Sequence, residues 1–171
     1  MTALMLSFIC GPYIISWLKT YQENGQPIRE DGPEGHLITK IGTPTMGGVM
    51  ILLALVVSTL LWADLRNGYI WAVLGVTVAY GMIGFVDDYI KITQNNSKGL
   101  SAKIKLFLQI FVAIISTYYI ISLGSEPLVT SLSIPFFKTV LIDLGWFFIA
   151  FSVIVMVGSS NAVNLTDGLD G

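Results

Sequence analysis

Residues 69–86 read YIWAVLGVTVAYGMIGFV and contain no Asp, Glu, Lys or Arg. A helix needs about 20 apolar residues to cross a hydrocarbon core about 30 Å thick, and somewhat fewer where polar flanks snorkel. A run of this kind could form a strand in water, but in lipid the backbone must satisfy its own hydrogen bonds, which a helix does within one segment. The stretch therefore predicts a helix that spans a membrane.

Four further stretches have the same character. None of them contains a charged side chain, and they cover residues 3–18, 47–63, 106–123 and 144–163. Together the five stretches predict an all-α fold, a polytopic membrane helix bundle with five transmembrane helices. Because the sequence has no internal repeat and no low-complexity linker, we expect residues 1–171 to form a single membrane domain.

The composition of the whole chain excludes other classes of protein. Of 171 residues, 54% are hydrophobic and 12% are charged, whereas soluble domains carry charge on about 25% of positions. The mean hydropathy of +0.75 excludes a soluble globule and a disordered chain. A net charge of −2 gives no indication of nucleic acid binding, and a single cysteine, Cys10, cannot form an internal disulfide.

The first stretch, residues 3–18, has a second interpretation as a secretory signal peptide. A signal peptide begins with a basic segment and ends in a small-residue cleavage site. Neither flanks this stretch, which ends in Trp17 and Leu18 and is followed by Lys19. This pattern favours a membrane helix.

Lysine and arginine are distributed unevenly between the loops. Seven of the nine basic residues lie in loops 19–46 and 87–105, namely Lys19, Arg29, Lys40, Lys91, Lys98, Lys103 and Lys105. The alternate loops, 64–68 and 124–143, hold only Arg66 and Lys138. The positive-inside rule assigns the lysine-rich loops to the cytoplasm, so the N-terminus is expected outside and the end of the chain inside.

Three segments on the predicted cytoplasmic side carry residues that membrane packing does not require. They read KIGTPTMGG (40–48), GFVDDYIK (84–91) and NAVNLTDGLDG (161–171). The topology, which was derived from the basic residues alone, places all three at the same membrane surface. Their convergence is the main indication of function in the chain.

Asp87 and Asp88 follow the third apolar stretch directly. Adjacent carboxylates near a membrane are unfavourable unless a cation compensates them, and Lys91 at i+4 and i+3 can share a helical face with either. They could form a solvated helix end with one surface ion pair. However, acidic residues at a helix C-terminus face the unfavourable end of the helix dipole, and ionisable groups at membrane depth are commonly functional.

The segment 161–171 contains two Asn, two Asp and one Thr. Such oxygens suit Mg²⁺, which keeps several waters and also binds substrate phosphate. A loop rich in Asx turns would need fewer of these residues. In the segment 42–48, glycines at the start of a helix could bind phosphate through backbone N–H groups, or Thr could simply cap the helix.

The lysines after the Asp pair allow two interpretations. They could act as an orientation signal that contacts anionic lipid headgroups, or they could neutralise a pyrophosphate. Carboxylates, cation ligands and lysines at a membrane surface are the groups that phosphoryl transfer to a lipid phosphate requires, because positioning and charge neutralisation supply most of its rate.

The three segments 42–48, 84–91 and 161–171 resemble motifs of the polyprenyl-phosphate N-acetylhexosamine-1-phosphate transferases, and the resemblance spans nearly the whole chain. It is strongest to members that use UDP-N-acetylmuramoyl-pentapeptide. It implies that undecaprenyl phosphate attacks the β-phosphate of this donor, with Mg²⁺ as cofactor, giving lipid I and UMP. This is a step of peptidoglycan synthesis at the cytoplasmic face of the bacterial inner membrane. The resemblance also allows a homodimer in the lipid bilayer.

The resemblance also implies roles for individual residues. Asp87 would be the base that deprotonates or orients the lipid phosphate, Asp88 would assist with the metal or the diphosphate, and Asn164 would be a Mg²⁺ ligand. The implied substrate-binding residues are Lys40, Lys103, Asn161, Asp167, Gly168, Leu169 and Asp170.

The sequence also departs from the family pattern. Members of the family have about ten membrane helices, and they carry a further catalytic Asp and a His-rich motif after the third segment, whereas this sequence ends at Gly171. We therefore expect residues 1–171 to be an N-terminal fragment, and we expect the fragment alone to have negligible activity.

Three alternatives remain open. The first is a sibling enzyme that transfers N-acetylglucosamine-1-phosphate to the same lipid, which the Asp pair would serve equally well. The second is a membrane transporter or channel with Asp87 and Asp88 along a cation path, although pathway carboxylates normally lie deeper in the bilayer. The third is a truncated paralogue with a binding or assembly role.

Overall fold

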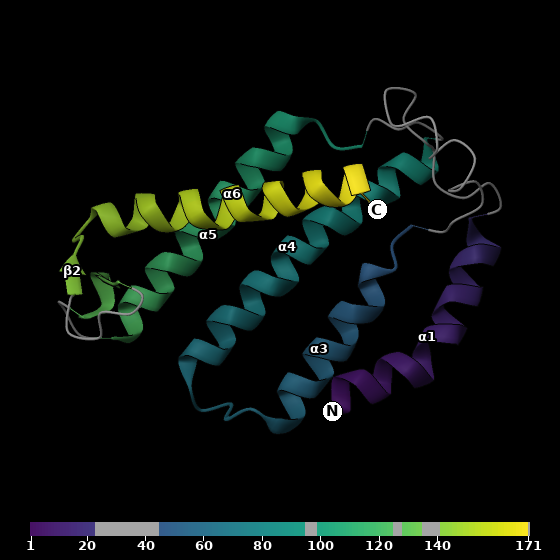
Figure 1. Cartoon of the computed structure of the whole chain (residues 1–171), viewed down its shortest axis with the longest axis horizontal. Coiled ribbons are helices and arrows are strands. Elements are labelled where there is room, and N and C mark those ends of the chain that lie inside the picture. Colours follow the sequence, from purple (N-terminus) through teal and green to yellow (C-terminus); the bar gives the residue numbers. More distant parts are fainter. Residues whose placement is uncertain (23–44, 95–98, 125–127, 135–140, 171) are drawn as a thin grey trace. The chain divides into compact units, whose positions relative to one another are not determined.

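The computed structural model describes residues 1–22, 45–94, 99–124, 128–134 and 141–170. For residues 167–170 it describes the backbone alone. Helices dominate this part of the chain, and a short 3₁₀ turn, η1 (Leu128–Thr130), follows the fourth of them. The α-helices are α1 (Thr2–Tyr21), α3 (Gly48–Trp62), α4 (Gly68–Thr93), α5 (Ala102–Leu123) and α6 (Phe147–Asp170) (Figure 1). The predicted all-α membrane helix bundle is confirmed.

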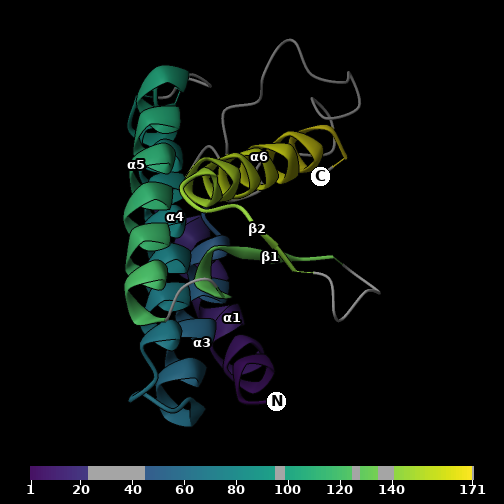
Figure 2. The same cartoon turned by 90° about the vertical axis from the view of Figure 1, so that its left-hand side faces the viewer.

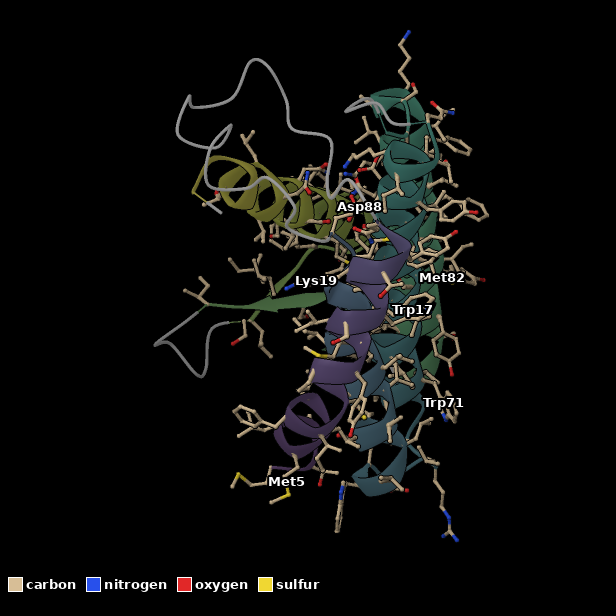
Figure 3. The ribbon with its side chains drawn as sticks, turned by 90° about the vertical axis from the view of Figure 1, so that its right-hand side faces the viewer. Met5, Trp17, Lys19, Trp71, Met82 and Asp88 are labelled. Carbon is tan, nitrogen blue, oxygen red and sulfur yellow. The ribbon has the colours of Figure 1, made fainter. Side chains whose placement is uncertain are left out.

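The helices agree with the five predicted spans in number and differ in length. Four of them are long and apolar enough to cross a membrane, whereas α3, with 15 residues, is shorter. Large apolar side chains remain exposed on their surfaces, for example Met5 and Trp17 of α1, which are 59% and 63% exposed (Figure 3). A water-soluble protein rarely exposes so much apolar surface. The chain is therefore a multi-pass membrane protein.

The helices α4 and α6 each extend seven residues beyond their predicted ends. The third apolar stretch was predicted to end at residue 86, but α4 continues to Thr93 and contains both Asp87 and Asp88. The helix tolerates this acidic pair because Lys91, one turn further on, lies on the same face. Likewise, α6 runs to Asp170. Residues 164–170, which were predicted to follow the fifth membrane helix, are therefore part of it.

The chain divides into two compact units. The first comprises Met1–Ala63 and Thr77–Lys105, and the second comprises Asp64–Val76 and Leu106–Gly171. The prediction of a single membrane domain over residues 1–171 stays a prediction.

In the first unit, α1 and α3 lie side by side and run in opposite directions. At one end Trp62 Nε1 donates a hydrogen bond to Thr2 Oγ1 at 2.9 Å, and at the other end Gln22 pairs with Thr45. Gly81 provides the close approach between α4 and α3, since a Cβ at this position would lie 2.8 Å from Leu52 Cδ2. Small residues allow such contacts between membrane helices.

In the second unit, a short antiparallel hairpin interrupts the helical pattern. Strand β1 (Ser131–Ser133) pairs with β2 (Leu141–Asp143), with Leu132 opposite Ile142 (Figure 2). The sequence predicted only a connecting loop here. Asp143 Oδ1 accepts hydrogen bonds from Thr130 Oγ1 at 2.7 Å and from Gly145 N at 2.9 Å. The Gly145 amide, and then the Thr130 hydroxyl, lower the pKa of the Asp143 carboxyl.

Candidate active site

Asp87, Asp88 and Lys91 form one ionic cluster on α4. Lys91 Nζ lies 2.7 Å from Asp87 Oδ2 and 3.0 Å from Asp88 Oδ1. The helical repeat alone brings these groups together, because residues three and four apart are neighbours on a helix surface. The predicted compensation of the Asp pair by Lys91 is confirmed.

Asp87 is the inner carboxylate of the pair, with only 8% of the residue exposed. Its Oδ1 accepts a hydrogen bond from the backbone N–H of Leu100 at 2.8 Å, and Lys105 Nζ lies 3.8 Å from its Oδ2. Both oxygens therefore face donors or cations. This carboxylate ties the start of α5, and the residues just before it, to α4.

Gly99 is packed against the same ion pair. A Cβ at this position would lie in the space that Asp87 occupies, and only 2.8 Å from Lys91 Cε. The chain can pass this close because Gly99 has no side chain, so the Leu100 amide reaches the buried carboxylate.

Asp88 is the more open carboxylate, with a side chain that is 29% exposed. Its Oδ2 accepts a hydrogen bond from the Thr45 hydroxyl at 2.9 Å. Figure 3 labels Asp88 among the side chains of α4. Each of its oxygens has one partner within the described part of the chain, which leaves lone pairs for a ligand.

Asn161 and Asn164 belong to the second unit, on the last turns of α6. Asn161 Nδ2 donates to Gln109 Oε1 at 2.7 Å and to the Val157 carbonyl at 2.8 Å. Gln109 is 3% exposed, so this pair is a buried polar link between α5 and α6. Asn164, one turn further along, is exposed.

The remaining predicted site residues are placed less fully. Lys103 is exposed on the first turn of α5. Four others lie in the last turn of α6, with side chains outside the described part, namely Asp167, Gly168, Leu169 and Asp170. Lys40 lies outside the described residues.

The described residues offer a limited set of ligands for Mg²⁺. Among them, no group of three or more His, Cys, Asp or Glu side chains could hold a metal ion. Mg²⁺ often uses only one or two carboxylates, and takes its other ligands from water and substrate phosphate. Asp88 fits that role in the first unit, whereas the oxygens of Asp87 already face Lys91, Lys105 and the Leu100 amide.

Sequence reasoning missed several residues of this cluster. Thr45 and Lys105 were recognised only as members of a motif and of a basic cluster, while Gln22, Gly99 and Leu100 were not considered. Only the i+3 and i+4 spacing of Lys91 gave a local signal. The other hydrogen bonds and ion pairs join residues between 13 and 43 positions apart, which no periodicity indicates.

Comparisons with known proteins agree with the motifs. The model of glycosyl transferase family 4 matches residues 70–171, and a phospho-N-acetylmuramoyl-pentapeptide-transferase signature matches residues 40–52. A protein of Granulibacter bethesdensis named phospho-N-acetylmuramoyl-pentapeptide-transferase is 59% identical over 171 residues, which are 100% of this chain and 47% of that protein. The chain thus spans about half the length of this curated relative. Since the family model covers more than half of the chain, the chain belongs to glycosyl transferase family 4.

Proposed function

We propose that this chain is part of an enzyme that transfers phospho-N-acetylmuramoyl-pentapeptide from its UDP conjugate to undecaprenyl phosphate. The products are lipid I and UMP, and the reaction serves peptidoglycan synthesis at the cytoplasmic face of the bacterial inner membrane. The name of the 59% identical relative supports this choice within the family, as does the signature at residues 40–52. The Asp87–Asp88–Lys91 cluster is the structural observation that carries it.

In the proposed reaction an oxygen of the lipid phosphate attacks the β-phosphorus of the donor. A new P–O bond forms, the bond from that phosphorus to the bridging oxygen breaks, and UMP leaves with the bonding electrons. The chain's task is to hold two anionic substrates close together, which demands fixed cations and fixed carboxylates. Lys91 and Lys105, both anchored on Asp87, are suited to oppose phosphate charge.

The two carboxylates are suited to different tasks. Asp88 is part exposed, and each of its oxygens has one hydrogen-bond partner among the described residues. We therefore assign it the contact with the metal or the diphosphate. The base role of Asp87 stays a prediction. To fulfil it, Asp87 would have to exchange one of its present partners for the lipid phosphate.

Mg²⁺ is the proposed cofactor, and the family resemblance makes Asn164 its proposed ligand. When bound, it would neutralise negative charge on the diphosphate. Lys40, Lys103, Asn161, Asp167, Gly168, Leu169 and Asp170 remain the proposed substrate-binding residues. A homodimer likewise stays a prediction.

The test is product formation by the full-length protein that contains this chain, purified in detergent. We expect lipid I and UMP from undecaprenyl phosphate and UDP-N-acetylmuramoyl-pentapeptide, and no product from UDP-N-acetylglucosamine. Asp88→Asn should lower the rate by about 100-fold or more, as loss of a group that acts on the reacting atoms does. The exposed Asp64 provides the control, because Asp64→Asn should leave the rate unchanged.

Other outcomes decide between the alternatives. Product from UDP-N-acetylglucosamine alone would assign the chain to the sibling enzyme, and absence of product from both donors would overturn the proposal. Removal of divalent cations by a chelator should abolish turnover, and added Mg²⁺ should restore it. Full activity in the chelator would remove Mg²⁺ from the proposal.

A further inference from the structure

Gln22 connects the end of α1 to the candidate active site through Thr45. Its Oε1 accepts a hydrogen bond from the Thr45 N–H at 2.9 Å, and its Nε2 donates to the Thr45 carbonyl at 3.2 Å. The Thr45 hydroxyl in turn donates to Asp88 Oδ2. One chain of hydrogen bonds therefore joins Gln22, which follows α1, and Thr45, which precedes α3, to Asp88 within α4.

The Gln22 side chain is suited to this contact by its chemistry. A primary amide carries one donor and one acceptor side by side, so it can satisfy both polar groups of a backbone residue at once. Gln22 is only 5% exposed, so water cannot easily replace either bond. An apolar side chain here would leave the Thr45 N–H and carbonyl without these partners, which is unfavourable for buried groups.

The backbone beside Thr45 requires such support. The next residue, Met46, has φ of 69°, in the left-handed region that residues other than glycine rarely occupy. A residue held there is strained by about 1 kcal/mol or more, and it persists only where its surroundings fix it. The two hydrogen bonds from Gln22 fix the residue directly before Met46.

We propose that Gln22 is a positioning residue for the active site. It holds the backbone of Thr45 so that the Thr45 hydroxyl keeps the open carboxylate of Asp88 in place. This inference rests on the proposed function for its effect on turnover, but the hydrogen-bonded arrangement itself can be tested separately.

The first experiment compares Gln22→Leu with Gln94→Leu in the full-length protein. Gln94 is a matched control, because it also follows the last residue of a helix and donates its backbone N–H to the carbonyl four residues earlier, but it is exposed. We expect Gln22→Leu to lower kcat by about 10- to 100-fold, the effect of a small displacement of a reacting group. KM for the nucleotide should change by less than about threefold, because transition-state interactions are lost rather than ground-state binding. Equal kcat values for the two variants would overturn the proposal.

A double-mutant cycle with Thr45→Val tests whether Gln22 acts through the Thr45 hydroxyl. Once that hydroxyl is absent, Gln22→Leu should lower kcat by less than about threefold further, because coupled residues are not additive. Thr45→Ser keeps the hydroxyl and should restore most of the rate lost in Thr45→Val. If the losses in Gln22→Leu and Thr45→Val multiply instead, Gln22 acts by another route and the proposal fails.

Hydrogen exchange separates this inference from the proposed function. The Thr45 amide is bonded to Gln22, so its exchange should accelerate about tenfold or more in Gln22→Leu and stay unchanged in Gln94→Leu. Should the wild-type protein produce no lipid I, the proposed function fails, but accelerated exchange would still support the Gln22–Thr45 clamp. Unchanged exchange would overturn the clamp whatever the enzyme activity.

Discussion

Neighbouring residues of identical chemistry occupy different environments in this protein. Asp87 is buried and faces Lys91, Lys105 and a backbone amide, whereas Asp88 is part exposed and meets a hydroxyl and one lysine. The difference arises because successive helical positions point about 100° apart, so one carboxylate faces the start of α5 and the other faces the segment before α3. Stability and chemistry should therefore depend differently on the two.

Asp87→Asn should destabilise the protein more than Asp88→Asn. The asparagine at position 87 could still accept from the Leu100 amide, but it would leave the charges of Lys91 and Lys105 without their main partner. We expect a loss of about 3 kcal/mol, the low end of the range for a buried pair that loses one partner. For Asp88→Asn we expect about 1 kcal/mol or less, as for exposed pairs.

Thermal or denaturant unfolding of the full-length variants in detergent measures this difference. Equal destabilisation by the two substitutions would contradict the distinction between an anchoring and an open carboxylate.

The helices make contact through two kinds of residue, small ones that allow close approach and buried amides that pair. Gly81 brings α4 against Leu52 of α3, and the Gln109–Asn161 pair joins α5 to α6. Both kinds of contact are expected in a membrane, because apolar side chains gain little free energy by leaving lipid. Close packing and hydrogen bonds between helices hold them together instead.

Substitution of Gly81 tests the close contact between α4 and α3. Gly81→Val should destabilise the protein by about 1–3 kcal/mol, because the added side chain meets Leu52 in a packed contact. Gly84→Val is the control one turn along the same helix, since a Cβ at Gly84 meets nothing within 4 Å, and its effect should stay within about 0.5 kcal/mol. Similar unfolding temperatures for the two variants would contradict the proposed α3–α4 contact.

The Gln109–Asn161 pair allows a test by compensation. Asn161→Leu leaves the amide of Gln109 without its 2.7 Å partner, and we expect a loss of about 1 kcal/mol, as for other interhelical hydrogen bonds in membranes. The double substitution Asn161→Leu with Gln109→Leu should recover part of this loss, because the buried Gln109 Oε1 that lost its donor is then absent.

The exposed Asn164 is the matched control, because Asn164→Leu should change the unfolding temperature little. A double variant that is less stable than either single variant would show that Gln109 and Asn161 also stabilise the protein through contacts other than their mutual hydrogen bond.

At the scale of the whole molecule, the orientation in the membrane decides which side each loop faces. The distribution of basic residues predicts that residues 64–68 lie outside and the end of α4 inside. Since Asp87 and Asp88 lie less than two turns before the end of α4, this orientation decides whether the cluster can meet a cytoplasmic nucleotide.

Cysteine labelling tests the orientation. In a variant of the full-length protein without its native cysteines, Cys10 among them, a membrane-impermeant maleimide should label Leu65→Cys in intact cells. It should label Gln94→Cys only after the membrane is permeabilised. The reverse pattern would refute the orientation, and with it the cytoplasmic site.

The sequence by itself determined the properties that depend on local chemistry. Charge-free apolar stretches predicted the helices, the uneven distribution of lysines predicted an orientation, and the spacing of Asp87, Asp88 and Lys91 predicted their ion pairs. The helices and the ion pairs follow from the length that a bilayer demands and from the helical repeat, both of which are visible within a few turns of chain. The orientation rests on the positive-inside rule and stays a prediction. Helix ends were less predictable, because Lys91 permits α4 to continue through an acidic pair.

Only the tertiary structure decided which carboxylate is buried and what holds it. Leu100, Lys105, Thr45 and Gln22 reach the Asp pair from segments outside α4, with intervening stretches that carry no periodic signal. The physical reason is that these contacts depend on how helices pack, which is set by side-chain shape at distant positions such as Gly81 and Leu52. A local pattern specifies an element, whereas the partners of a buried polar group are specified only when the elements meet.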